Sequence, residues 1–388
     1  MVSDWSHGSP RVDPVNVLPL LSSMSHPIPA RRVFLAVALL GFALSACSDD
    51  SVGPGDSIVA GVDLDALFAE ATASEVAAVE TEWEARTIEA AGVEVVKDTV
   101  VVQSGLDVRV RVVTHFVDDF RHVGAVLSVV GASGPLPVIV YTHGGDAGVS
   151  VEDVLFQFPL VGADAARFVW VVPSFRSEPL RFRGQTWTSQ GSPSPWDRDV
   201  DDALSLLDAT FSIEAAADEE NVAVLGFSRG AGVGMLMGIR DVRIDRIVEF
   251  FGPTDLFGPF MRAVTQERLL GEPRDLPGLA YLDETFLQPL AAGEKTLSEV
   301  RLELVRRSPV LWADRLPTLQ LHHGTDDPIV EVSQAESLIA AMAVIGRGEP
   351  DFQPFLYEGG THSPLTLPGS VGRAVSFLLA LLPAPLAN

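Results

Sequence analysis

The sequence predicts an α/β domain with a mostly parallel sheet that carries helices on both faces. Three observations predict this fold class. The composition is that of a globular protein, with 47% hydrophobic and 20% charged residues. From residue 138 on, short and continuously apolar runs alternate with segments of helical periodicity, and glycine-rich turns follow several of the runs. Continuous apolar strands are typical of parallel sheets, because helices bury both faces of such a sheet.

The charge balance excludes one class of partner. The chain has 388 residues, with 27 Lys and Arg against 52 Asp and Glu, and a net charge of −25. Such a field repels a phosphate backbone, so we expect no nucleic-acid partner. The single cysteine excludes an intramolecular disulfide and a metal site built from several cysteines.

The N-terminal region has the features of an export signal. Arg31 and Arg32 precede a run of 12 apolar residues at 33–44, which is too short to span about 30 Å of hydrocarbon comfortably. Leu-Ser-Ala-Cys at 44–47 resembles the bacterial lipobox, in which the cysteine is lipidated and becomes the first mature residue. We expect residues 1–46 to comprise an upstream segment and a signal peptide, and Cys47 to anchor an exported protein in a bacterial membrane. The alternative is an ordinary cleavage site beside an incidental cysteine, and both the Sec and the twin-arginine route stay open.

The remaining elements follow in order. A Ser/Asp/Gly/Pro tether at 47–61 precedes an Ala/Glu-rich helical segment at 62–92, with Gly92 as its C-cap. Residues 93–388 form the α/β domain, and a mostly helical insertion or lid at 256–308 interrupts it. Strands are expected at 93–102, 108–117, 123–130, 138–142, 168–172, 222–225, 244–251, 318–322 and 352–357, and helices at 199–210, 231–239, 333–344 and 371–382.

A Gly-x-Ser-x-Gly sequence occupies residues 226–230, between an expected strand and an expected helix. A nucleophile elbow is a sharp strand-to-helix turn with a strained serine, and side chains at Gly226 and Gly230 would clash in it. The helix N-terminus adds backbone N–H groups and the positive end of a dipole. We therefore expect Ser228 to be a nucleophile. The alternative is a glycine-rich turn with a bystander serine.

His-Gly-Gly at 143–145 directly follows the expected strand 138–142. Acyl transfer builds negative charge on a carbonyl oxygen, and backbone N–H groups aimed at that oxygen lower the barrier. Glycine lets the backbone come close. We expect an oxyanion hole from the N–H groups of Gly145 and Arg229, and we expect His143 to be structural rather than catalytic.

An acid and a histidine follow the last two strands. Asp326 and Asp327 come after strand 318–322, and His362 lies in the loop after strand 352–357. An acid at the end of a strand can orient a histidine and stabilise its imidazolium. We favour Asp327 as that acid, with Asp326 as its competitor and Asp255 as the fallback. His362 is the expected general base.

The adjacent pair His322 and His323 also raises the question of a metal site. Neighbouring residues of a strand point to opposite faces of the sheet, so the two rings cannot share one ion. We expect no metal and no cofactor.

The set resembles the α/β-hydrolase superfamily, in particular the catalytic domain of the prolyl oligopeptidase group and related esterases. The residues that carry the resemblance are 143–145, 226–230, 323–327 and 359–362, with weaker similarity at 173–176 and 196–203. It covers about residues 100–385, and the order Ser, Asp, His is that of α/β-hydrolases. The resemblance implies Ser228 as nucleophile, Asp327 as acid, His362 as base, and Gly145 and Arg229 as the oxyanion hole.

One departure from that group bears on the substrate. True oligopeptidases carry a large β-propeller, and the stretch between the tether and the first strand is far too short for one. We therefore expect a serine hydrolase that cleaves small carboxylic esters through an acyl-enzyme. A serine peptidase acting on short peptides is the first alternative, and a non-catalytic lipid-anchored binding protein is the second. Apolar side chains at 256–308 either line an acyl or aromatic pocket or only bury the insertion.

Overall fold

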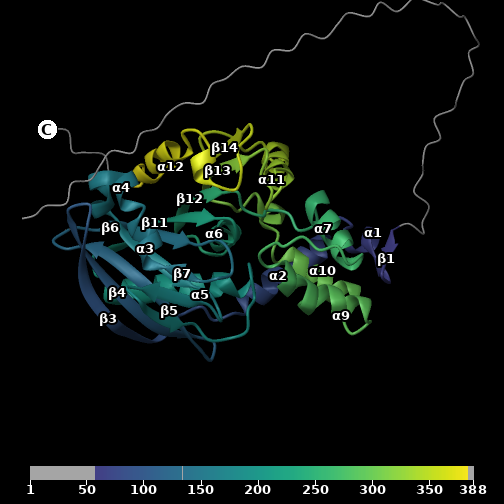
Figure 1. Ribbon diagram of the computed structural model, residues 1–388, viewed down its shortest axis with the longest axis horizontal. Helices are drawn as coiled ribbons and strands as arrows, with labels where there is room; N and C mark the ends of the chain where they lie inside the picture. The colour runs from purple at the N-terminus through teal and green to yellow at the C-terminus, as the bar shows by residue number, and fades with distance from the viewer. Residues whose placement is uncertain (1–56, 133, 383–388) are drawn as a thin grey trace, which may run out of the picture. The chain divides into compact units, whose positions relative to one another are not determined.

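The computed structural model describes residues 57–132 and 134–382. The apolar run at 33–44, Cys47 and most of the expected tether lie outside these residues. A nine-stranded sheet in the order β14-β13-β12-β11-β6-β8-β5-β4-β3 forms the centre of the fold (Figure 1). Within the described ranges, no helix is both long and apolar enough to cross a membrane.

The sheet is antiparallel at one side and parallel elsewhere. β3 (Ala91–Gln103), β4 (Leu106–Val117) and β5 (Phe120–Val129) pair in sequence order, and β5 pairs antiparallel with β8 (Val169–Ser174). β8 and the next five strands are parallel: β6 (Leu136–Thr142), β11 (Ala217–Phe227), β12 (Ile244–Phe250), β13 (Thr318–Gly324) and β14 (Phe352–Tyr357). The mostly parallel sheet is therefore confirmed, and the carboxyl ends of six strands meet at one edge.

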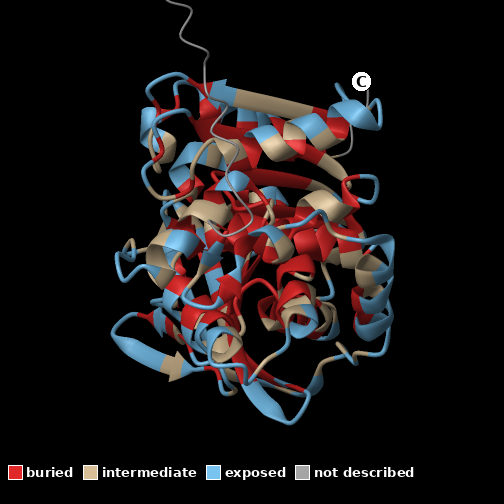
Figure 2. Ribbon diagram, turned by 90° about the vertical axis from the view of Figure 1, so that its right-hand side faces the viewer, coloured by how far each residue is buried: buried red, intermediate tan, exposed pale blue. Residues whose placement is uncertain are grey.

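Helices cover both faces of the sheet, as expected. Three pack on one face, α5 (Arg198–Ile213), α6 (Arg229–Arg240) and α11 (Ser333–Val344), and three on the other, α3 (Val151–Leu155), α4 (Phe158–Val161) and α12 (Ser370–Leu379). The strands alternate accordingly. In β6, Val138 and Val140 join the first core, while Ile139 and Tyr141 join the second. Figure 2 shows these strands buried between helices with exposed outer sides. A small separate sheet is formed by β7 (Val149–Ser150), β9 (Pro179–Phe182) and β10 (Gln185–Thr188).

The N-terminal segment differs from the single helix expected over 62–92. A hairpin of β1 (Ile58–Val59) and β2 (Val62–Asp63) leads into α1 (Leu64–Leu67), and α2 covers only Ala73–Glu84. α2 begins there because Thr72 forms a capping box with Glu75. Gly92 is not a C-cap. It lies in β3 with φ +57°, where the β3–β4 register shifts, and a bulge of this kind favours glycine.

Residues 256–308 are mostly helical, as expected. They contain α7 (Pro259–Leu269), α8 (Leu279–Leu282), a π-helical turn (Asp283–Leu287), α9 (Gln288–Ala291) and α10 (Leu297–Val305). α10 packs against α2, where the Arg301 guanidinium donates to both Glu75 oxygens at 2.7 and 2.9 Å. Trp83 of α2 packs against Trp312, with ring centroids 4.6 Å apart. The insertion and the N-terminal segment are thus joined.

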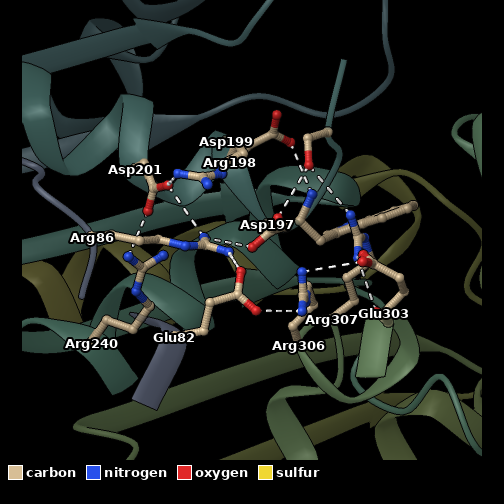
Figure 3. Close-up of polar contacts among 12 residues, drawn as sticks. Glu82, Arg86, Asp197, Arg198, Asp199, Asp201, Arg240, Glu303, Arg306 and Arg307 are labelled. Atoms are coloured by element: carbon tan, nitrogen blue, oxygen red, sulfur yellow. Dashed lines mark hydrogen bonds and ion pairs between the residues drawn. The ribbon is translucent and has the colours of Figure 1, made fainter. Parts of the chain in front are cut away.

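Buried ion pairs fix the start of α5 against these segments (Figure 3). Arg86 donates to Asp197 at 2.7 Å and to Asp201 at 3.3 Å, and Arg240 donates to Asp201. Arg307 donates to the carbonyl oxygen of Pro195 at 2.8 Å. Removing one partner would leave a buried charge unpaired, which is strongly destabilising. The network therefore holds the backbone at 195–197 in place.

Candidate active site

Ser228 lies at the turn between β11 and α6. Its backbone has φ 53° and ψ −121°, a conformation that L residues rarely adopt. Two glycines make room for the turn. A Cβ at Gly230 would lie 2.1 Å from the carbonyl oxygen of Thr142, and one at Gly226 would lie 2.7 Å from the Cα of Ala231. The strand, the strained serine and the helix form the geometry of a nucleophile elbow.

The Ser228 hydroxyl makes no hydrogen bond to His362 or to any other residue within 57–132 and 134–382. The two residues are linked through the end of β12 instead. The N–H of Ser228 donates to the carbonyl oxygen of Phe250 at 2.9 Å. The next residue, Phe251, packs on the His362 ring with centroids 4.2 Å apart. Both candidate groups therefore lie at the carboxyl edge of the sheet.

The structure joins His362 to Asp327. His362 Nδ1 lies 2.7 Å from Asp327 Oδ2, and Asp327 Oδ1 accepts the N–H groups of Ile329 and Val330 at 2.9 and 3.0 Å. Burial alone would raise the pKa of Asp327, but the hydrogen bonds from His362 and the two N–H groups outweigh burial and hold that pKa below its usual range. An ionised carboxylate only accepts, so His362 Nδ1 carries the hydrogen of this contact, and Nε2 is the ring nitrogen left to exchange a proton.

The two competing acids are engaged elsewhere. Asp326 is exposed and accepts the Thr325 hydroxyl at 3.2 Å. Asp255 accepts the N–H of Phe257 at 2.9 Å, within its own turn. Asp327, the favoured acid, is the one that contacts His362.

The adjacent histidines of β13 face opposite sides of the sheet, as expected. His322 bonds the Tyr357 hydroxyl at 2.8 Å and Gln320 at 2.9 Å, whereas His323 bonds the carbonyl oxygen of Val330 at 2.8 Å. Burial lowers the pKa of His322 to about 3, so it is neutral at physiological pH. Across the described part of the chain, no three His, Cys, Asp or Glu side chains are grouped to hold a metal ion.

The loop after β6 runs directly beside Ser228. A Cβ at Gly144 would lie 3.0 Å from the Ser228 Cβ, which is closer than most Cβ contacts, so glycine suits this approach. Gly145 has φ +71°. His143 is buried and stacks on Phe175, with centroids 4.5 Å apart, in keeping with a structural role. The loop therefore lies where an oxyanion hole for Ser228 would be needed.

The Arg229 side chain is buried behind this loop, a role that the sequence did not reveal. Its guanidinium donates to both oxygens of Asp199 at 2.8 and 2.9 Å, to Glu178, and to the carbonyl oxygen of Gly145 at 3.1 Å. The available signal was the run of acids at 197–202 among apolar positions of a helix. Asp199 shares the buried side of α5 with Val200 and Ala203. Acids on a buried face need cationic partners.

A cavity of about 50 Å³ opens beside Ser228. Trp196 and Val330 line it together with apolar side chains of the insertion, among them Phe260, Met261, Val264, Leu276, Leu279 and Leu282. Trp196 is wedged between two glycines, since a Cβ at Gly232 or Gly278 would lie 2.8 or 2.7 Å from its ring. A void needs about 10–15 Å³ to hold one water molecule, so the cavity has room for only a few small groups. A larger depression of about 890 Å³ beside Arg246 and Arg373 contains none of the expected site residues.

No family model matches the chain, and no curated protein matches its sequence. Solved structures do match its fold. Acetyl xylan esterase 1 from a Thermoanaerobacterium species has 16% identity and a TM-score of 0.55, over 80% of this chain and 94% of that one. An acetyl xylan esterase from a Paenibacillus species has the same identity and TM-score, over 83% of this chain and 100% of that one. A variant of the cell-wall-degrading esterase LipA from Xanthomonas oryzae has 14% identity and a TM-score of 0.50, over 76% of this chain and 98% of that one. The chain therefore has the α/β-hydrolase fold that its sequence resembles.

Proposed function

We propose that this protein is a serine hydrolase that cleaves carboxylic esters. The observation that carries the proposal is the 2.7 Å contact between His362 and Asp327 at the sheet edge where the strained Ser228 turn lies. The fold shared with three esterases supports it.

In the proposed reaction, Ser228 Oγ attacks the ester carbonyl carbon and its proton passes to His362 Nε2. Substrate binding must first bring the hydroxyl within hydrogen-bond reach of Nε2. Asp327 holds the Nδ1–H and stabilises the imidazolium. The oxyanion accepts hydrogen bonds from the backbone N–H groups of Gly145 and Arg229. The alcohol leaves with the proton from His362, and water then attacks the acyl-enzyme by the same route to release the acid.

The cavity beside Ser228 supports a short acyl group. Its wall is mostly apolar, and its room for a few small groups suits a short acyl chain better than a long one. The insertion supplies most of its wall. We therefore propose that residues 256–308 close over the acyl group of the substrate.

A substrate panel tests this proposal. We expect p-nitrophenyl acetate and butyrate to be turned over at least about tenfold faster than the decanoate, because misfit in a closed pocket costs 1–3 kcal/mol. Aminoacyl and prolyl p-nitroanilides are expected to be inert. Turnover of the anilides would favour a peptidase, and failure of all substrates together with failure of fluorophosphonate labelling would favour a binding protein.

One pair of variants separates the pocket from the rest of the insertion. Met261→Ala removes side-chain volume from the cavity wall and should shift the preference toward longer acyl chains. Leu270→Ala is the matched control, because Leu270 is 60% exposed at the end of the same helix and does not line the cavity. An unchanged preference in the Met261 variant would contradict the assignment of the pocket.

We also propose that the protein is exported and anchored in a bacterial membrane through lipid on Cys47. Two acyl chains give stable anchoring, whereas one gives marginal binding. In a bacterial host fed labelled palmitate, the full-length chain should incorporate the label and Cys47→Ser should not. A wild-type chain that stays unlabelled would contradict the lipobox assignment.

A further inference from the structure

Two buried polar atoms behind the loop that follows β6 (residues 143–145) face each other without a hydrogen-bond partner among the described residues. They are Nε2 of His143 and Oε2 of Glu178, and they lie 3.5 Å apart. Leaving a buried polar atom unpaired is destabilising. A proton held between the two atoms would satisfy both.

His143 presents a lone pair to Glu178. Its Nδ1 lies 3.1 Å from the carbonyl oxygen of Gly144. A carbonyl only accepts, so Nδ1 carries the hydrogen. Burial, together with the nearby Arg229 charge, lowers the pKa of His143 to about 3, so the ring is neutral and Nε2 is an acceptor.

Glu178 is suited to supply the missing hydrogen. Its Oε1 accepts from Arg229, while Oε2 faces Nε2 of His143. The Arg229 charge is already balanced by the two-point contact with Asp199, so an ionised Glu178 would leave a net negative charge in the buried cluster. Burial raises the pKa of Glu178. Arg229 opposes this effect, and the carboxylates of Asp199 and Asp146 add to it.

We propose that Glu178 is a positioning residue. Its protonated carboxyl donates to His143 Nε2, and this keeps the ring hydrogen on Nδ1, which donates to the Gly144 carbonyl oxygen. The proposal rests on the proposed function, since its catalytic effect appears only if Gly145 N–H stabilises an oxyanion.

The consequence for the loop follows from peptide geometry. The only cis peptide bond in the described residues precedes Pro350, so the Gly144–Gly145 peptide is trans. In a trans peptide the C=O and the next N–H point in opposite directions. Because His143 draws the Gly144 carbonyl to the buried side, the Gly145 N–H points away from it. Arg229 holds the next carbonyl, that of Gly145, in the same way. The two buried side chains therefore set the orientation of the loop.

Two substitutions of Glu178 test whether its carboxyl donates a hydrogen to His143 Nε2. Gln keeps an acceptor for Arg229 and offers N–H to His143, so Glu178→Gln should stay within about threefold of wild-type kcat. Glu178→Met fills the space without donating and should lower kcat about 10- to 100-fold, below the full loss expected for an absent oxyanion donor. KM should change little, because the oxyanion forms only in the transition state. Rates are to be referred to active sites titrated with fluorophosphonate, so that misfolded protein is not counted.

The outcomes distinguish a proton donor at Glu178 from an anion for Arg229 and from a residue without effect on catalysis. If Gln lowers kcat as much as Met, Glu178 acts as an anion for Arg229 and the proposal is overturned. It is also overturned if Met retains the wild-type kcat. Glu214→Gln is the matched control, because Glu214 pairs with Arg111 and Ser128 away from the loop and its substitution should leave kcat unchanged.

A spectroscopic readout distinguishes failure of this proposal from failure of the proposed function. The ¹⁵N shifts of the His143 ring, assigned with a His143→Asn variant, should show a protonated Nδ1 and a bare Nε2 near pH 7 in the wild type and in Glu178→Gln. Glu178→Met should lose this preference. A wild-type ring protonated at Nε2 would overturn the proposal whether or not the protein hydrolyses esters.

Discussion

Ser228→Ala should lower kcat for p-nitrophenyl acetate by about 10⁵–10⁶-fold, the scale on which removal of a catalytic serine acts. Without the hydroxyl no acyl-enzyme forms, and only binding and the oxyanion hole remain. The fold should tolerate the change. The Ser228 hydroxyl has no hydrogen bond within the described residues, and alanine meets the same backbone strain as serine at φ 53°. A melting temperature within a few degrees of wild type is therefore expected.

The measurement is paired with covalent labelling. A fluorophosphonate should modify one serine of the wild-type chain, and mass spectrometry should place the adduct on the peptide that contains Ser228. Ser376→Ala, a change on α12 where the hydroxyl only bonds the Gly372 carbonyl, is the control and should label normally. An adduct on the Ser228→Ala chain would show that the nucleophile lies elsewhere.

Asp327→Asn should lower kcat by about 10³–10⁴-fold, as expected when the base is held in the wrong tautomer. The amide oxygen can still accept the N–H groups of Ile329 and Val330. The amide nitrogen would donate to His362 Nδ1, so the ring would carry its hydrogen on Nε2 and could not take the Ser228 proton. KM should change little, since the contact lies behind the base.

Two further carboxylates serve as comparisons for this variant. Asp326→Asn should be nearly silent, because Asp326 is exposed and its carboxylate accepts only the neighbouring Thr325 hydroxyl among the described residues. Asp255→Asn should retain most of kcat. A large loss with Asp255→Asn, together with a mild effect of Asp327→Asn, would transfer the role of acid to the end of β12.

The parallel strands and the serine turn were predictable because their signals are local. Continuous apolar runs such as 138–142 need no tertiary information, and the two glycines around Ser228 are demanded by the turn itself. The choice of Asp327 over Asp326 was harder, since it depends on which side chain the loop after β13 turns toward His362. That loop is shaped by the N–H groups of Ile329 and Val330, which bond to Asp327.

Other features depend on partners far along the chain. Glu178, Asp199 and Arg229 meet only once the residue before β9, α5 and α6 are packed together, so no spacing in the sequence marks them as a cluster. The limits of the N-terminal helix likewise follow from the Thr72 cap and from the bulge that pairing with β4 imposes on Gly92. Periodicity alone cannot report either effect.

The joining of α2 to α10 sets an order of events during synthesis. Glu75 is synthesised 226 residues ahead of Arg301, whose guanidinium donates to it in the folded protein. A contact of that separation has a high loop-closure cost and forms late. We therefore expect α2 to gain this partner only after residue 301 has been synthesised.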